Sequence, residues 1–472
     1  MRQSRTKIIC TLGPASTSPE KINALAAGGM DMVRLNFSHG ENGDKAASIA
    51  KIRAIGAEKG IRLPIIADLS GPKLRIGKFA SGQAELRPGE RFTLRAAFEP
   101  GDSTGVSVNC PEILKDLKKG DRVLLGDGEF ELRVVSPGAA EAECEVLAGG
   151  ILKSNKGLSA PGASISTVVP TDKDVEDAKF AIGNGVDWIA LSFVRSPAEI
   201  RRMKSVIAGV GGSQSVIAKI EKREALEELD GILEESDAVM IARGDMGLEI
   251  PLEYVPLRAK EITAKANLRG VPVITATQML ESMIFNPRPT RAEVSDIANA
   301  ILDGTDALML SGETAVGKYP VEAVEVMDRV AAATEAKIDY RDLLERRSGQ
   351  QEPNVSDAVA HAACHTALQT GAAVIICCTR SGQTARHVAR YRPRAVIAVA
   401  SPYENTLMKT AILWGAVPVK IPVARDTDSM VEQAKRSVLE SRLARKGDRA
   451  VIIAGAPVNV PGATNMIRVD TL

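Results

Sequence analysis

Eight short apolar segments constrain the fold of this chain more than any other feature. Each is too short to be a helix, and most are rich in β-branched residues, which is typical of buried strands. The segments cover residues 7–10, 32–35, 63–67, 188–191, 216–218, 238–241, 271–274 and 307–310. Helix-like stretches such as 197–208 and 224–235 lie between them. Strands that alternate with helices imply parallel pairing, and eight such units predict an α/β fold, a (β/α)8 TIM barrel.

One interval in this series, from Asp68 to Ser192, is far longer than a helical crossover needs. Residues 71–168 are rich in Gly and Pro and contain short alternating segments, which is typical of a small all-β module. We therefore predict an inserted small β-barrel that acts as a lid and excludes water from the barrel mouth. The catalytic barrel would then comprise residues 1–70 and 169–338.

The chain beyond the barrel has a different pattern. Residues 339–354 are charged and polar and indicate a linker. Five apolar segments then alternate with helical stretches, which predicts a separate C-terminal α/β domain with an open sheet over residues 355–472. These segments lie at 374–378, 396–400, 417–421, 451–454 and 466–469.

Composition excludes several classes of function. The net charge of +1 gives no overall field toward nucleic acid or a membrane, and 3% aromatic residues argue against base-stacking surfaces. No apolar run approaches the roughly 20 residues that span a bilayer, and the N-terminus lacks the apolar core of a signal peptide. The six cysteines form no C-x-x-C pair, so we expect reduced core thiols in a cytoplasmic protein.

Polar residues follow the eight apolar segments, at the strand ends where a (β/α)8 barrel has its active site. They are Thr11, 34–36, Asp68, Ser192, 219–221, 243–245, 275–277 and Ser311. Glu221 and Asp245 would suit a hard cation such as Mg²⁺, and Lys219 beside that ion could neutralise charge on a phosphate. The pattern indicates a metal-assisted enzyme with an anionic substrate. The alternative is two unrelated surface acids and a solvated lysine.

Residues 379–384 lie between the first strand of the last domain and its helix. This loop (Thr379, Arg380, Ser381, Gly382, Gln383 and Thr384) combines hydroxyls, a glycine and an arginine at a helix N-terminus, which favours a phosphate cradle. An ordinary helix cap is the alternative interpretation.

Three further patterns favour structural roles. Thr290 and Glu293 fit a capping box. His361 and His365 have the spacing of two metal ligands, but no third ligand accompanies them. The glycines at 209–212 precede a strand, whereas a dinucleotide-binding loop follows one, so they predict a turn.

The chain resembles the pyruvate kinases along nearly its whole length. The resemblance is carried by TKIICTLGPAS at 6–16, RLNFSHG at 34–40, KIE at 219–221, ARGDMG at 242–247, ATQMLESM at 276–283, PRPTRAE at 287–293 and MLSGETA at 309–315. These motifs fall at the strand ends already identified. The resemblance implies phosphoryl transfer from phosphoenolpyruvate to ADP in glycolysis, a homotetramer, and a phosphorylated effector such as a sugar monophosphate or AMP.

The resemblance also implies roles for individual residues. Glu221 and Asp245 would hold Mg²⁺, and a second Mg²⁺ would travel with ADP. Lys219 and Arg34 would bind the transferring phosphoryl group, and the amides of Arg243, Gly244 and Asp245 the substrate carboxylate. Thr277 would help to protonate the enolate. The nucleotide would contact Asn36, His39, Arg75 and Lys156.

One segment departs from the family pattern. Many members bind K⁺ through residues matching Asn36, Ser38, Asp68 and the carbonyl of Leu69, and read D-T-K-G-P-E after the third strand. This chain reads D-L-S-G-P-K, so Lys73 stands where the family has glutamate. Because an ammonium carries the same charge as K⁺, we expect that K⁺ is not required. A solvated lysine at the hinge of the lid is the alternative.

Two other functions remain open from the sequence. Related barrels that hold Mg²⁺ with Glu and Asp include aldolases and mutases acting on a pyruvate-like enolate, although the lid and the Thr277 segment argue against them. The third possibility is a metabolite sensor without catalysis, but Lys219, Glu221, Asp245 and Thr277 are all retained.

Overall fold

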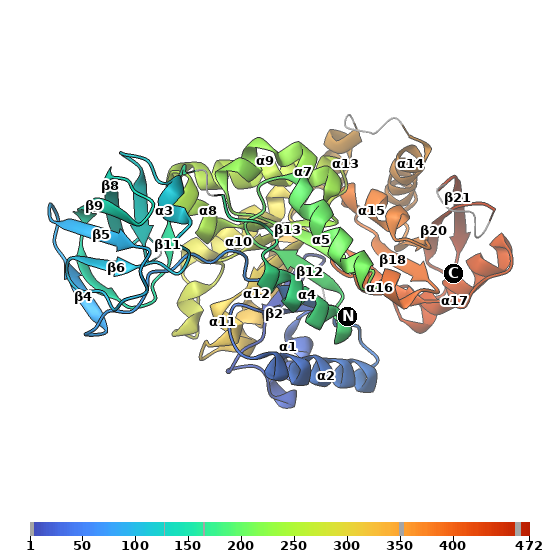
Figure 1. Ribbon diagram of the computed structural model, residues 1–472. Helices are drawn as coiled ribbons and strands as arrows, with labels where there is room; N and C mark the ends of the chain where they lie inside the picture. The colour runs from blue at the N-terminus through green and yellow to red at the C-terminus, as the bar shows by residue number, and fades with distance from the viewer. Residues whose placement is uncertain (1–3, 127, 164–165, 349–353, 458–463) are drawn as a thin grey trace.

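Three bodies lie in a row in the computed structural model, which describes residues 4–126, 128–163, 166–348, 354–457 and 464–472. The (β/α)8 barrel occupies the middle, with the β-rich insertion at one end and the C-terminal α/β domain at the other (Figure 1). No helix in the described part of the chain is long and apolar enough to cross a membrane.

The predicted barrel is confirmed. Eight parallel strands close in the order β1-β16-β15-β14-β13-β12-β3-β2. They are β1 (Lys7–Thr11), β2 (Met32–Asn36), β3 (Ile65–Asp68), β12 (Trp188–Leu191), β13 (Ser215–Ile220), β14 (Ala238–Ala242), β15 (Val273–Ala276) and β16 (Ala307–Leu310). Almost every residue of these strands is buried, because helices cover the outer face and side chains fill the interior, as in other all-parallel sheets.

Helices connect the barrel strands. They are α1 (Pro19–Gly28), α2 (Asn42–Lys59), α4 (Asp172–Gly183), α5 (Pro197–Gly209), α6 (Arg223–Glu227), α7 (Leu229–Glu235), α8 (Arg243–Glu249), α9 (Val255–Leu268), α10 (Arg291–Asp303), α11 (Gly312–Ala315) and α12 (Pro320–Glu335). The single helix predicted over 224–235 is instead two short helices that meet at Glu228. The predicted capping box of Thr290 and Glu293 is present at the start of α10.

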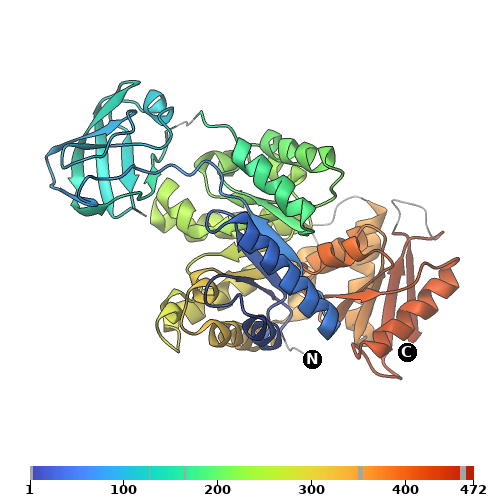
Figure 2. The same cartoon turned by 60° about the horizontal axis from the view of Figure 1, so that its bottom comes forward.

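The insertion is all-β apart from the short helix α3 (Ile113–Asp116). A six-stranded sheet and a two-stranded sheet enclose an apolar core of their own. Their strands are β4 (Gln83–Leu86), β5 (Arg91–Arg95), β6 (Gly105–Ser107), β7 (Arg122–Leu125), β8 (Phe130–Ser136), β9 (Glu141–Ala148), β10 (Gly150–Lys153) and β11 (Leu158–Ser159). Two connecting segments join this module to the barrel (Figure 2).

The C-terminal domain has the predicted open sheet, in the order β19-β18-β17-β20-β21, with β21 antiparallel. Its elements are α14 (Val355–Thr370), β17 (Val374–Cys378), α15 (Gln383–Arg390), β18 (Val396–Ser401), α16 (Glu404–Thr410), β19 (Ala416–Lys420), α17 (Thr427–Glu440), β20 (Arg449–Ala454) and β21 (Met466–Thr471). The predicted linker contains helix α13 (Tyr340–Ser348), and its residues 349–353 lie outside the described residues. All six cysteines are free, and all except Cys110 are buried.

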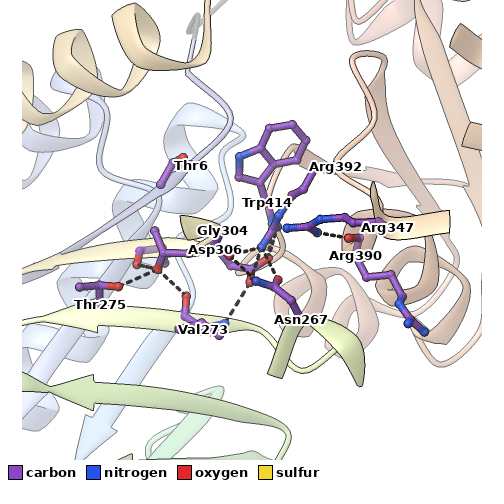
Figure 3. Close-up of polar contacts among 12 residues, drawn as sticks. Thr6, Asn267, Val273, Thr275, Gly304, Asp306, Arg347, Arg390, Arg392 and Trp414 are labelled. Atoms are coloured by element: carbon purple, nitrogen blue, oxygen red, sulfur yellow. Dashed lines mark hydrogen bonds and ion pairs between the residues drawn. The ribbon is translucent and has the colours of Figure 1, made fainter. Parts of the chain in front are cut away.

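Asp306, just before β16, attaches the C-terminal domain to the barrel (Figure 3). Its carboxylate pairs with both terminal nitrogens of Arg392, the longer contact being 2.9 Å from Nη2 to Oδ2. It also accepts N–H groups from Val273 at 3.0 Å and from Trp414 at 3.1 Å. The Arg392 guanidinium lies 5.4 Å from the Trp414 ring centroid. One buried carboxylate thus fixes two barrel strands and the C-terminal domain together.

We expect Asp306→Ala to destabilise the protein by about 3–5 kcal/mol, because Arg392 would remain buried without its partner. Asp303→Ala is the matched control, since its pair with Lys260 lies nearer the surface and should contribute about 1 kcal/mol or less. Denaturant unfolding of both variants measures the difference. Equal losses would contradict this account of the interface.

Candidate active site

The ammonium of Lys219 lies at the centre of the polar groups at the barrel mouth. Its Nζ donates to Ser192 Oγ at 2.8 Å and lies 2.8 Å from Glu221 Oε1 and 3.3 Å from Asp68 Oδ1. Burial alone would lower the pKa of Lys219, but the carboxylates of Asp68, Glu221 and Asp245 together raise it. The side chain is therefore a fixed positive charge over the usual pH range.

Arg34 adds a second positive charge from β2. Its Nε donates to Asp68 Oδ2 at 2.6 Å, and its Nη1 donates to Thr11 Oγ1 at 3.0 Å. Burial would raise the pKa of Asp68, yet Lys219 and Arg34 hold it below its usual value. Asp68 therefore stays ionised and contacts both cations.

Glu221 and Asp245 carry the negative charge on the other side of Lys219. Burial raises the pKa of Asp245 to about 6, and the nearby charge of Glu221 adds to this effect. Glu221 accepts the Phe193 N–H on Oε2 at 2.8 Å, while its buried Oε1 has no directed hydrogen bond among the described residues. Two crowded carboxylates, one oxygen of which is partnered only by the Lys219 ammonium, fit a hard divalent cation that takes its remaining ligands from water or substrate.

The segment after β15 has an unusual backbone. Thr277 and Gln278 both have positive φ, at 68° and 56°, which costs energy for residues with a Cβ. The Arg243 side chain holds this turn by donating to the Thr277 carbonyl at 2.9 Å and to Asp296 at 2.7 Å. Thr277 Oγ1 accepts the Gly244 N–H at 2.9 Å. The threonine hydroxyl is thus held against the first turn of α8.

A cleft of about 360 Å³ lies between the insertion and the barrel. Glu221 and Asp245 line it from the barrel. Lys73, Arg75 and Lys156 line it from the insertion and its connection. The Lys156 ammonium lies 3.4 Å from Glu129. The cleft therefore brings three cationic side chains opposite the two carboxylates, which suits an anionic ligand carrying a metal ion.

The pKa of His39 reflects the positive charge of this region. Partial desolvation lowers its pKa, and the charges of Lys73, Arg75, Arg34 and Lys45 lower it further. The pKa of Lys73 is also lowered, first by desolvation and then by the positive charges of Lys219 and Arg75. The negative charges of Asp68 and Asp245 oppose this shift. The Lys73 ammonium thus lies within electrostatic reach of the central cluster, although it makes no hydrogen bond or ion pair with the residues described.

Most of the oxygen atoms that we predicted as ligands of a monovalent cation already accept hydrogen bonds or form ion pairs with protein groups. Asn36 Oδ1 accepts the Ser38 N–H at 2.9 Å. Asp68 is engaged by Arg34 and Lys219. The Leu69 carbonyl accepts Ser192 Oγ at 2.7 Å. Protein donors thus satisfy much of this set of oxygens, and its role as a cation site stays a prediction.

The loop at 379–384 forms the start of α15, far from the cleft. Thr379 Oγ1 accepts the Gly382 N–H at 3.0 Å, and Ser381 Oγ accepts the Gln383 N–H at 3.4 Å. Thr384 is buried and contacts Thr464. Arg380 is exposed and stacks 5.4 Å from the Tyr403 ring centroid. The two hydroxyls thus hold the turn before α15, whose N-cap is Gly382 and has no side-chain cap, while the arginine remains accessible.

Sequence reasoning gave no role to three residues that the structure places in the site. Ser192 joins the Lys219 ammonium to the Leu69 carbonyl, and Thr11 joins Arg34 to the Leu310 carbonyl at 2.8 Å. Both were recognisable as polar residues at strand ends. Asp296 on α10, which anchors Arg243, gave no such signal because it lies within a helix.

Comparison with known proteins agrees with the resemblance. The family described as pyruvate kinase, barrel domain matches residues 3–324, and pyruvate kinase, alpha/beta domain matches residues 357–470. The chain is 42% identical to pyruvate kinase 2 of Synechocystis sp. over 99% of its own length and 79% of that protein. For the pyruvate kinase of Clostridium acetobutylicum the identity is 40%, with 99% of each chain covered. A crystal structure of a pyruvate kinase from Cryptosporidium parvum matches with a TM-score of 0.94 and 34% identity, covering 99% of this chain and 96% of that one.

We expect Lys73→Met to raise the pKa of His39 toward its usual value, because one of the positive charges that depress it is removed. At a pH near 6 the imidazole would therefore be more protonated in the variant. NMR titration of the metal-free protein measures this directly, since the chain has only 4 histidines. Lys78→Met, at an exposed lysine of the same segment, is the control. An unchanged pKa of His39 in Lys73→Met would show that the Lys73 ammonium does not lie near His39.

Proposed function

The chain belongs to the pyruvate kinase family, and we propose that it transfers the phosphoryl group of phosphoenolpyruvate to ADP in glycolysis, with Mg²⁺ required. The relatives from Synechocystis sp. and Clostridium acetobutylicum are both named as pyruvate kinases, which supports this reaction. The observation that carries the proposal is that Glu221 and Asp245 line a cleft together with cations of the lid, while the Lys219 ammonium lies 2.8 Å from Glu221. A protein that had lost catalysis would have no reason to keep this costly arrangement of buried charges.

Glu221 and Asp245 are the residues that would hold Mg²⁺. When bound there, the ion would supply positive charge to the oxygens of the phosphate and of the developing enolate. Glu221 is already oriented by the Phe193 N–H, and Asp245 is the carboxylate whose pKa is raised to about 6 by burial and by Glu221. Deprotonation of Asp245 near neutral pH would make both carboxylates available as ligands.

Lys219 and Arg34 would act on the phosphoryl group itself. The bond from phosphorus to the enol oxygen breaks, and a bond to an oxygen of the ADP β-phosphate forms. Negative charge spreads over the phosphoryl oxygens in this transition state, so fixed cations nearby lower its energy. Both side chains are held by Asp68, so they need no reorganisation during the reaction.

Thr277 would help to deliver a proton to the enolate carbon, giving pyruvate. The N–H groups of Arg243, Gly244 and Asp245 begin helix α8 and could donate hydrogen bonds to the substrate carboxylate, because first-turn N–H groups have no acceptor within a helix. Since Thr277 Oγ1 already accepts the Gly244 N–H, the carboxylate and the hydroxyl would lie side by side. The threonine would then lie next to the carbon atoms of the substrate.

The lid side of the cleft would take the nucleotide. Arg75 and Lys156 line this side, and His39 lies within electrostatic reach of Arg75 and Lys73. Asn36 is the last residue of β2, three residues before His39 in the chain. These positive charges suit the phosphates of ADP with its own Mg²⁺.

The direct test is formation of pyruvate and ATP from phosphoenolpyruvate and ADP. We expect turnover that requires Mg²⁺, and a decrease of at least about 100-fold in kcat for Thr277→Val or Lys219→Gln, on the scale of other preorganised groups. A coupled assay with purified protein measures it. Absence of ATP formation by the wild type, with cleavage of a pyruvate-derived C–C bond instead, would favour the aldolase alternative.

We also propose that turnover by this protein does not require K⁺. Lys73 lies in the electrostatic field of Asp68 and Asp245, and the oxygens of the monovalent site already accept hydrogen bonds or ion pairs from protein groups. A protein-borne ammonium would then replace the charge that relatives take from solution.

We expect turnover of the wild type to be similar in Tris buffer with and without K⁺, and Lys73→Glu to require K⁺ for full activity. The physical reason is that glutamate would add a negative charge where the ammonium had been. Lys78→Glu controls for a general change in surface charge. Strong activation of the wild type by K⁺ would refute this part of the proposal.

We further propose a homotetramer in the cytoplasm whose C-terminal domain binds a phosphorylated effector at residues 379–384. The exposed Arg380 guanidinium beside Tyr403 supports this assignment. Arg380→Ala should abolish activation by AMP or a sugar monophosphate without changing basal kcat, as measured in steady-state kinetics. Unchanged activation would show that the effector binds elsewhere.

A further inference from the structure

The insertion leaves the barrel through the segment that begins at Gly71 and returns through the segment that ends at Thr171. Both segments pass the N-terminus of helix α4, where Asp174 is completely buried. The two connections are the only covalent attachments of the lid, so their spacing determines where the lid can sit over the cleft (Figure 2).

The carboxylate of Asp174 joins these two segments. Oδ1 accepts the Gly71 N–H at 2.9 Å. Oδ2 accepts the Thr171 N–H at 2.9 Å and the Thr171 hydroxyl at 2.7 Å. A capping box accounts for the bonds to Oδ2, but it does not require the bond to Gly71. Oδ1 therefore accepts a hydrogen bond from the segment that leaves the barrel, and Oδ2 accepts hydrogen bonds from the segment that returns to it.

Gly71 also connects this hinge to the active site. Its φ is +63°, and a Cβ at this position would lie 2.6 Å from Phe193 Cδ2. Phe193 has a positive φ of 57° and donates its N–H to Glu221 Oε2. The backbone of the hinge thus packs directly on the residue that orients one of the proposed metal ligands.

We propose that Asp174 is a positioning residue for phosphoryl transfer. By holding both connections of the lid at a fixed separation, it sets how Arg75 and Lys156 face Asp245 across the cleft. The inference rests on the proposed function, because it assigns the lid to the nucleotide half of that reaction. Asp174 touches neither substrate, so its effect acts through the geometry of the hinge.

The substitution Asp174→Asn removes one of the two acceptor oxygens with almost no change in the shape of the side chain. An asparagine has one acceptor oxygen, so its NH₂ group would face an N–H donor at either Gly71 or Thr171. Thr171→Ala removes only the hydroxyl of the cap and leaves the Gly71 bond in place. Asp172→Asn, at an exposed carboxylate in the same first turn, controls for the loss of charge.

Two reactions distinguish a hinge defect from a damaged barrel. The first is phosphoryl transfer to ADP, which needs the lid. The second is exchange of the methyl protons of pyruvate in D2O with Mg²⁺ and inorganic phosphate, in which a C–H bond breaks to the enolate and a C–D bond forms. By microscopic reversibility this exchange uses the enolate-protonating groups of the barrel alone.

We expect Asp174→Asn to lower kcat/KM for ADP at least about tenfold, on the scale expected for small errors in positioning, while proton exchange stays within about twofold of the wild type. Thr171→Ala and Asp172→Asn should change neither reaction by more than about twofold, because both retain the Gly71 bond. Hydrogen–deuterium exchange of the Gly71 amide or of the Thr171 amide should become faster only in the Asp174 variant, since only there does one of these two N–H groups lose its acceptor.

Parallel loss of both reactions in Asp174→Asn would overturn the inference, because Asp174 would then support the barrel itself. Wild-type transfer in that variant, or an equal loss in Thr171→Ala, would overturn it as well. A wild-type enzyme that exchanges pyruvate protons but makes no ATP would contradict the proposed function, and the inference with it.

Discussion

The buried ammonium of Lys219 is the interaction on which the whole site depends. It lies within 3.3 Å of Asp68 and 2.8 Å of Glu221, and Asp245 also raises its pKa. These residues come from the end of β3, from the position just after β13 and from the first turn of α8, and they meet because β14, β13, β12 and β3 are successive parallel neighbours in the barrel. Without the cation, three carboxylates would crowd one small volume, and without them a buried lysine would lose its proton.

Two buried aspartates hold the outer bodies on the barrel. Asp306 binds Arg392 and Trp414 before β16, at the face opposite the site, so the C-terminal domain docks there. Asp174 lies on the side of the site, where it joins both connections of the insertion. In each case one carboxylate accepts hydrogen bonds from segments far apart in the chain, which makes the arrangement of bodies sensitive to single substitutions.

Local pattern was sufficient to predict most of the fold, because β-branched segments at regular spacing specify a parallel barrel almost by themselves. The eight strands and the strand-end positions of Lys219, Glu221 and Asp245 followed from it. The break at Glu228 did not, since helix propensity does not distinguish one helix from two. Asp174 and Asp296 were missed because an aspartate that makes tertiary contacts from a helix has the same sequence appearance as a solvated one.

A divalent cation held by Glu221 and Asp245 beside Lys219 should respond to both neighbouring charges. Calorimetric titration of Mg²⁺ into wild type, Asp245→Asn and Lys219→Met measures this response. We expect opposite effects: affinity falls at least about tenfold when the Asp245 charge is lost and rises when the neighbouring positive charge of Lys219 is removed. Equal affinity in all three proteins would place the ion elsewhere and contradict the account.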